Sequence, residues 1–284
     1  MSAADHERSV TVLTHGRPAE TGVALRQLAD VAQAAGFALR LDPDETRKFR
    51  LDHAAILADA PLERAVALCV ALGGDGTVLR GLRSYCRTGV PVFAVNFGEV
   101  GFLATVEPDA LPAAFELAIR REFDLLKLPA IELDGGRQIA INDVSIHRKV
   151  GERVAELAYQ VSGEEVGSVR CDGLVVATPA GSTGYNLANG GPVMAWGVEG
   201  MVVSFIAPHS LSARALVIAP DDVLTLQNCS HGALDVSVDG RPAAEIAPGE
   251  TIEARFVDDV ATLAQMHGSS FYRRLREKFG RLSR

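Results

Sequence analysis

A nearly continuous apolar run that ends in two glycines limits the fold of this chain more than any other feature. Residues 65–72 read Ala-Val-Ala-Leu-Cys-Val-Ala-Leu and lead directly into Gly73 and Gly74. A strand with apolar side chains on both faces is typical of a parallel sheet that is covered on each side. Residues 90–95 form a second run of this kind. We therefore expect a parallel α/β sheet in the first half of the chain.

The segments before and after these two runs fit the same fold. Residues 10–13 and 37–41 have the composition of strands, and the Ala- and Leu-rich segment 23–35 between them has that of a helix, which gives a βαβ unit. Residues 109–121 have helical spacing, and Pro112 is tolerated in a first turn. We predict a Rossmann-like α/β domain over residues 1–128.

After residue 128 the pattern changes to short β-branched segments separated by turn formers. Asp134, Gly135 and Gly136 predict a hairpin turn, and Asp239 with Gly240 predicts another. Further strands are expected at residues 173–178, 201–207, 223–227, 234–239 and 251–256. We predict a β-rich domain over residues 129–265. The helical segment 271–279 lies in a final stretch, 266–284, that we expect to pack back on the first domain.

Composition excludes several classes of protein. The 284 residues carry a formal net charge of −8, which argues against a broad surface for nucleic acid or membranes. No apolar run approaches the roughly 20 residues of a spanning helix, and the first residues do not resemble a secretory signal. The four cysteines form no CxxC pair, so we expect free thiols and no zinc site. These features favour a cytoplasmic protein.

The segment Gly73-Gly74-Asp75-Gly76-Thr77 lies between the first apolar strand and a helical stretch that starts at Val78. Glycines allow backbone amides to approach a polyphosphate, and a helix N-terminus adds donors and a favourable dipole. A carboxylate beside phosphates is best explained if it faces a proton donor or a metal ion. Asp75 is therefore a candidate general base. The alternative is a glycine-rich turn in which Asp75 only caps the helix.

A second loop with glycines follows the next strand. It reads Asn96-Phe-Gly98-Glu-Val-Gly101-Phe-Leu-Ala, and in an open parallel sheet it would lie beside the first loop. Phe102 and Leu103 are interpreted as core side chains.

The longest polar stretch of the β-rich half covers residues 172–186. Ser182, Thr183 and Asn186 could bind an adenine edge or a ribose, and Tyr185 could pack against a ring. A long surface loop is the alternative. The pair Asn142-Asp143 lies between two apolar segments and suits vicinal ribose hydroxyls, unless it marks a β-bulge or an edge position. His147 and His209 show no ligand spacing, and we interpret both as structural.

The order and spacing of these motifs resemble the NAD kinase family. The resemblance covers residues 67–279 and includes Asn-Leu-Ala-Asn-Gly-Gly-Pro at 186–192, Pro-His-Ser-Leu-Ser-Ala-Arg at 208–214 and the helical segment 271–279. The glycine loop alone is also found in diacylglycerol, sphingosine and phosphofructokinase-type kinases. The resemblance implies a two-domain NAD kinase-like architecture and a homodimer or homotetramer, with NAD in the cleft between the domains.

The resemblance also implies a reaction and a set of residues. ATP would phosphorylate the 2′-hydroxyl of the adenosine ribose of NAD, with Mg²⁺ held by the nucleotide rather than by side chains. Asp75 would be the base, and Gly73, Gly74 and Thr77 would form the phosphate loop. Residues near NAD would be Gly76, Asn142, Asp143, Arg170, Asp172, Thr183, Gly184, Tyr185, Asn186, Leu187, Ala188 and Ala207. Arg170 and Asp172 would lie on the nicotinamide side, across a subunit interface. Further candidates are Arg80, Asn96, Arg153, Ser182 and Arg241.

Four positions depart from the family pattern. Asp143 replaces the usual Glu, Ala180 a Thr, Gly184 an Ala, and Arg241 the common Gln. Asp143 is the shorter carboxylate, so its contact with NAD would be lost or relayed by water. Arg241 would change the charge of the cleft.

Two other functions fit parts of the sequence. A lipid kinase of the diacylglycerol type would need a basic or apolar membrane-facing surface, which the net charge disfavours. A non-catalytic dinucleotide sensor would need the binding residues but no base at Asp75.

Overall fold

The chain folds into two compact units. The structure is a computed structural model that describes residues 8–49, 52–97, 101–104, 106 and 110–280. The first unit comprises Met1–Lys127 and Val260–Arg284, and the second comprises Leu128–Asp259. Two strands, β6 (Asp124–Leu133) and β17 (Thr251–Gln265), carry the chain from one unit to the other. The chain returns to the first unit at Val260, earlier than the residue 266 that we expected.

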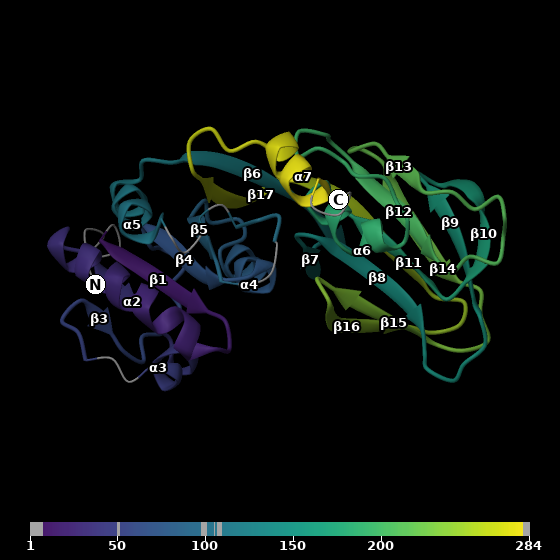
Figure 1. Cartoon of the computed structure of the whole chain (residues 1–284). Helices are drawn as coiled ribbons and strands as arrows, with labels where there is room; N and C mark the ends of the chain where they lie inside the picture. The colour runs from purple at the N-terminus through teal and green to yellow at the C-terminus, as the bar shows by residue number, and fades with distance from the viewer. Residues whose placement is uncertain (1–7, 50–51, 98–100, 105, 107–109, 281–284) are drawn as a thin grey trace. The chain divides into compact units, whose positions relative to one another are not determined.

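The first unit is built on a parallel sheet in the order β17-β5-β4-β1-β2-β3, in which every pair of neighbours is parallel (Figure 1). The further elements of this unit are β1 (Ser9–Thr14), α2 (Pro18–Ala34), β2 (Ala38–Arg40), α3 (Pro43–Lys48), β3 (Ile56–Leu57), β4 (Leu68–Gly73), α4 (Asp75–Ser84), β5 (Pro91–Asn96), α5 (Leu111–Arg120) and α7 (Phe271–Phe279).

Helices cover both faces of this sheet. Leu25 and Leu28 of α2 and Phe115 of α5 join Val70 and Phe93 in one apolar core. Helix α4 packs on the opposite face, where a Cβ at Gly81 would lie 3.1 Å from Val92 Cγ1 and 3.4 Å from Cys69 Sγ. Every residue of β1, β4 and β5 is buried as a result. The predicted parallel sheet is confirmed, and strand burial on both faces explains its apolar runs.

The second unit is a sandwich of antiparallel strands. One sheet has the order β13-β12-β11-β8-β15-β16, and β10, β9, β14 and the first part of β17 form another. The remaining elements are β7 (Gln138–Ala140), β8 (Asp143–Arg148), β9 (Ala155–Val161), β10 (Glu164–Cys171), β11 (Gly173–Ala177), a 3₁₀ turn η2 (Gly181–Thr183), α6 (Tyr185–Ala188), β12 (Met201–Ile206), β13 (Leu216–Ile218), β14 (Val223–Asn228), β15 (Leu234–Val238) and β16 (Arg241–Ile246). The predicted β-rich half is confirmed.

Both predicted hairpin turns are present. Asp134, Gly135 and Gly136 have φ values of 46°, 70° and 90° between β6 and β7, and Asp239 and Gly240 have 46° and 71° between β15 and β16. Positive φ at these positions is what a tight turn between antiparallel strands needs. The turns thus bring β6 beside β7 and β15 beside β16, as the sequence predicted.

Three predicted boundaries were wrong or fall partly outside the described residues. The helix predicted from residue 23 begins at Pro18, because proline fits the first turn of a helix. The strand predicted over residues 251–256 continues to Gln265, because its first part pairs with β14 and Thr262–Ala264 pairs with β5. The helix expected over 109–121 is α5, whose first turn holds Pro112, and residue 109 lies outside the described residues.

Candidate functional site

The glycine loop forms the junction between β4 and α4. Gly74 is the residue before the helix, and no side chain caps this end. A Cβ at Gly73 would lie 2.4 Å from Thr77 Oγ1, so glycine is required for the sharp turn. A Cβ at Gly76 would meet nothing within 4 Å, and Gly76 is exposed. The loop therefore offers an open helix N-terminus of the kind that binds phosphates.

Asp75 does not cap its own helix; its carboxylate binds the second glycine loop. The N–H of Phe102 donates to Asp75 Oδ2 at 2.8 Å, and the N–H of Leu103 donates to Oδ1 at 3.1 Å. A Cβ at Gly101 would lie 2.2 Å from Oδ1, so this approach needs glycine. The prediction that the two loops lie together is confirmed for the described part. Gly98 lies outside the described residues.

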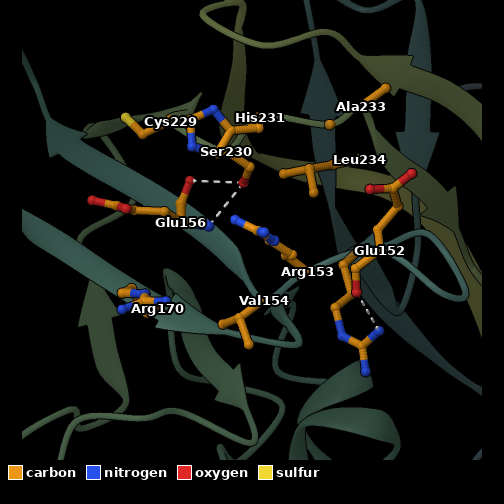
Figure 2. A pocket seen from close by; sticks show the side chains of 12 residues that line it. Glu152, Arg153, Val154, Glu156, Arg170, Cys229, Ser230, His231, Ala233 and Leu234 are labelled. Carbon is orange, nitrogen blue, oxygen red and sulfur yellow. Dashed lines mark hydrogen bonds between the residues drawn. The ribbon is translucent and has the colours of Figure 1, made fainter.

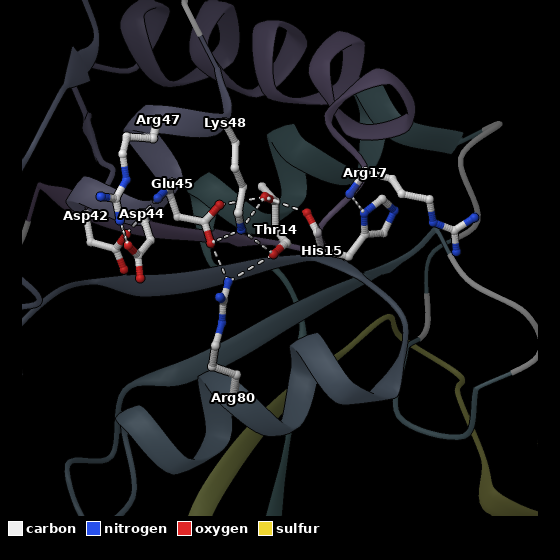
Figure 3. Close-up of polar contacts among 9 residues, drawn as sticks. All are labelled: Thr14, His15, Arg17, Asp42, Asp44, Glu45, Arg47, Lys48 and Arg80. Carbon is white, nitrogen blue, oxygen red and sulfur yellow. Dashed lines mark hydrogen bonds and ion pairs between the residues drawn. The ribbon is translucent and has the colours of Figure 1, made fainter.

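Two further candidates sit close to the glycine loop. Asn96 ends β5 opposite Gly73 and is buried. Arg80, in α4, belongs to a polar cluster that the sequence did not reveal (Figure 3). Its Nη2 binds the carboxylate of Glu45 and donates to the Thr14 carbonyl at 3.0 Å.

Glu45 is the centre of that cluster and is fully buried. Its Oε2 accepts from Thr14 Oγ1 at 2.5 Å and its Oε1 binds Lys48 Nζ at 2.9 Å, besides the contact with Arg80. A buried carboxylate is tolerated when it is paired and hydrogen bonded in this way. Two cations surround one anion here, so the cluster leaves a net positive charge at the end of β1.

In the second unit, Asn142 and Asp143 are held by the carboxylate of Asp239. Asp239 accepts the N–H groups of Ile141, Asn142 and Asp143 at 3.2, 2.7 and 3.3 Å. The sequence identified Asp239 only as a turn residue. Its second role, as the acceptor for three amides, depends on residues nearly 100 positions away, so no local pattern could reveal it.

The Asn142-Asp143 pair also packs against the long polar loop. Thr178 Oγ1 donates to the Ile141 carbonyl at 2.7 Å, and the Thr178 N–H donates to the Asn142 carbonyl at 2.9 Å. A Cβ at Gly181 would lie 2.0 Å from the same Asn142 oxygen. The two motifs therefore form one structural group in the second unit.

Burial and a neighbouring charge raise the pKa of Asp143, the acid of this structural group. Asp143 is buried, and burial together with the negative charge of Asp239 raises its pKa to about 7. Asp143 in turn adds to the effect of burial in raising the pKa of Tyr185. The ring of Tyr185 stacks on His147 with centroids 5.7 Å apart, and burial lowers the pKa of His147. His147 thus supports a candidate binding residue.

The polar loop divides into inward and outward side chains. Ser182 and Asn186 are fully buried: Ser182 Oγ bonds to the Pro179 carbonyl and the Met194 N–H, and Asn186 Nδ2 donates to the Ser182 and Pro192 carbonyls. Their side chains therefore brace the loop. The positions with exposed or half-buried surface are Thr183, Gly184, Tyr185, Leu187 and Ala188.

The remaining candidates lie at the ends of strands. Asp172 accepts a hydrogen bond from Arg148 Nε at 2.6 Å, which lowers the pKa of the Asp172 carboxyl. Ala207 follows β12 with a φ of 44°. Arg241 is exposed at the start of β16. Arg148 was not among the predicted residues, because its partner comes from another strand.

Arg153 and Arg170 line a pocket of about 360 Å³ in the second unit (Figure 2). The rest of its wall is formed by Arg148, Glu152, Val154, Glu156 and residues 229–234. The structure thus brings these two predicted arginines to one pocket. Asn142 and Tyr185 are not part of its lining.

Comparison with solved structures shows which proteins share the fold of this chain. The fold is similar to that of a yeast NADH kinase complexed with NADH, with a TM-score of 0.84, 23% identity and coverage of 96% of this chain and 88% of that one. It is also similar to an Archaeoglobus fulgidus NAD kinase in complex with ATP, with a TM-score of 0.74, 21% identity and coverage of 97% and 98%. These two structures share the two-unit fold of this chain.

Sequence comparison gives the particular family. The ATP-NAD kinase N-terminal domain matches residues 29–123 and the ATP-NAD kinase C-terminal domain matches residues 141–263. The NAD kinase of Gemmatimonas aurantiaca is 33% identical over 90% of each chain. NAD kinase 2 of Streptomyces coelicolor is 33% identical over 96% of this chain and 94% of its own. The chain belongs to the NAD kinase family and is a transferase.

Proposed function

We propose that this chain transfers the γ-phosphoryl group of ATP to the 2′-hydroxyl of the adenosine ribose of NAD and that Asp75 accepts the hydroxyl proton. The observation that supports the role of Asp75 is the pair of amides, from Phe102 and Leu103, that hold its carboxylate beside the glycine loop. Each carboxylate oxygen keeps a further lone pair for a substrate hydroxyl. Phosphoryl transfer needs mainly positioning, so a fixed acceptor that takes the proton late suits the reaction.

We assign dinucleotide binding to the second unit, around Asn142 and Asp143. Asn142 Oδ1 is buried and finds no hydrogen-bond partner within the described part of the chain, so a ligand donor would satisfy it. Tyr185 presents a half-exposed ring that is already oriented by His147. The full assignment comprises Gly76, Asn142, Asp143, Arg170, Asp172, Thr183, Gly184, Tyr185, Asn186, Leu187, Ala188 and Ala207, with Asn186 acting through the loop that it braces.

We assign the donor phosphates to Gly73, Gly74 and Thr77, with Arg80 and Asn96 beside them. The uncapped N-terminus of α4 and the net positive cluster around Arg80 support this assignment. The residues that the structure describes contain no group of three His, Cys, Asp or Glu side chains suited to a metal ion. Independently of this, we propose that a divalent cation such as Mg²⁺ is carried by the triphosphate, where it neutralises charge.

The proposal also includes a cytoplasmic location and a homo-oligomeric assembly. The four cysteines are free thiols, which fits a reducing compartment such as the cytoplasm. No helix in the described ranges is long and apolar enough to cross a membrane. A homodimer or homotetramer would place Arg170 and Asp172 at a subunit interface, as their likeness to family positions implies, and Arg153 shares a pocket with Arg170.

A coupled assay tests this function. Purified protein, ATP, Mg²⁺ and NAD are mixed, and NADP is read through an NADP-specific dehydrogenase. Formation of NADP supports the reaction, and its loss in Asp75→Asn supports the base. Asn can accept only one of the two N–H groups and turns a donor toward the other, so NAD affinity must be measured by calorimetry in parallel. A loss of NAD binding as large as the loss of turnover would contradict the role as base.

A further inference from the structure

The segment that holds Asp75 is itself held by the C-terminal helix. Arg274 of α7 donates from Nη1 to the carbonyl of Phe102, the residue whose N–H binds Asp75. Lys278, one turn later, places Nζ 4.6 Å from the centroid of the Phe102 ring. Two cationic side chains of α7 therefore contact Phe102: Arg274 binds its carbonyl and Lys278 lies over its ring. The N–H of Phe102 in turn binds the Asp75 carboxylate. All of these residues belong to the first unit.

Arg274 is unusual for a helix residue near the end of a chain. Only 8% of it is exposed, whereas its neighbour Arg273 is exposed and pairs with Glu277 at 3.1 Å on the surface. Burial lowers the pKa of Arg274 to about 10, and the negative charge of Asp75 opposes that effect. The guanidinium stays charged at neutral pH, so a buried positive charge interacts electrostatically with the Asp75 carboxylate. Burying a charge is costly unless it is compensated, and Asp75 supplies part of that compensation.

The start of α7 is fixed independently of Arg274. Ser270 caps the helix by accepting the N–H of Arg273 at 3.2 Å, and Phe271 is buried. The helix therefore has an anchor of its own at Ser270 and Phe271. Substitution at Arg274 or Lys278 would then weaken the contacts with Phe102 without unfolding the helix.

We propose that Arg274, assisted by Lys278, is a positioning residue for the catalytic base: it holds Phe102 so that the two amides fix the Asp75 carboxylate toward its substrate hydroxyl. This inference rests on the proposed role of Asp75 and extends it to the last helix of the chain. A displacement of a reacting group by about 1 Å can cost on the order of a hundredfold in rate. If the Asp75 carboxylate is only held less firmly, the rate should fall by less than that.

The kinetic test compares Arg274→Met with Arg274→Lys. Met replaces the aliphatic part of the Arg side chain and removes both the charge and the donor, so we expect kcat to fall about tenfold while the KM values for NAD and ATP change less than about threefold. Lys restores a charged donor and should recover most of kcat. Arg273→Met is the matched control on the exposed side of α7. A purely structural role would lower the melting temperature but leave kcat per folded molecule unchanged, which would overturn the proposal.

A second measurement does not depend on turnover. Hydrogen exchange of the peptide that covers residues 101–104 should be faster in Arg274→Met than in Arg273→Met. If wild-type protein makes no NADP, the proposed function fails, but exchange still decides whether α7 holds this segment. Unchanged exchange in Arg274→Met overturns the inference in either case. Should Arg274→Met not fold, Lys278→Met serves the same two tests, with an expected loss of kcat of about threefold.

Discussion

The two units hold an acidic site residue in opposite ways. In the first unit Asp75 is itself the acceptor of two backbone N–H groups, and a cationic side chain lies near it. In the second unit another carboxylate, Asp239, accepts the amides, and Asp143 is left buried beside its negative charge. Hydrogen bonds from peptide amides to a carboxylate therefore fix the site acid itself, Asp75, in the first unit. In the other unit the acceptor is Asp239, whose negative charge adds to burial in raising the pKa of Asp143. The first arrangement suits a base, and the second suits a group that binds while protonated.

The largest effect should come from a substitution of Asp75, the acid of the first arrangement. Asp75→Asn should reduce kcat about a thousandfold, or about 4 kcal/mol, because general base catalysis contributes in that range. The affinity for NAD should stay within about tenfold. Single-turnover NADP formation and calorimetry measure the two quantities. Asp143→Asn is the informative comparison, since we expect it to change NAD affinity more than turnover.

The second arrangement predicts an unusual dependence of stability on pH. Because the pKa of Asp143 is raised to about 7 in the folded protein, the folded state binds the proton more tightly than the unfolded chain. The contribution to stability is full below about pH 4 and is lost as pH rises through 7. The loss should be on the order of 4 kcal/mol. Urea unfolding at several pH values measures it, and the slope assigned to Asp143 should vanish in Asp143→Asn.

Removal of Asp239 should destabilise the second unit and lower the pKa of Asp143 part of the way toward its usual value. Asp239→Ala leaves three amides without their acceptor, which should cost about 2 kcal/mol of unfolding free energy. The dependence of the unfolding free energy on pH should also become weaker. The charge of Asp239, one of the two causes of the raised pKa of Asp143, is then gone. Asp235→Ala, at an exposed position of β15, the strand that precedes Asp239, is the control. Equal stability of the two variants would contradict the role given to Asp239.

The smallest effect should come from the ring of Tyr185. Tyr185→Ala removes the surface that stacks on His147 and should weaken NAD binding by about 1 kcal/mol, or about fivefold. Tyr185→Phe keeps the ring and should bind NAD nearly as tightly as wild type. Calorimetric dissociation constants of the two variants decide the point. A larger loss in the Phe variant would shift the role of Tyr185 from its ring to its hydroxyl.

Local chemistry explains which parts of this site were predictable. The strand that precedes Gly73 and the loop that contains Asp75 were predictable, because apolar runs and glycines leave a mark within a few residues. The hairpin at Asp239 was predictable for the same reason, since positive φ selects Asp-Gly pairs. The extension of β17 was not, because it depends on two different partner strands.

The sequence by itself determined the parallel and antiparallel halves, the position of the glycine loop and the family to which the chain belongs. Only the tertiary structure decided what each carboxylate touches. It joined Asp75 to Phe102, Phe102 to Arg274, Glu45 to Arg80, and Asp239 to the amides of residues 141–143. These partners lie between 27 and 172 residues apart in the chain. Hydrogen bonds over such separations exist only after folding has brought the backbone together, so a local pattern cannot encode them.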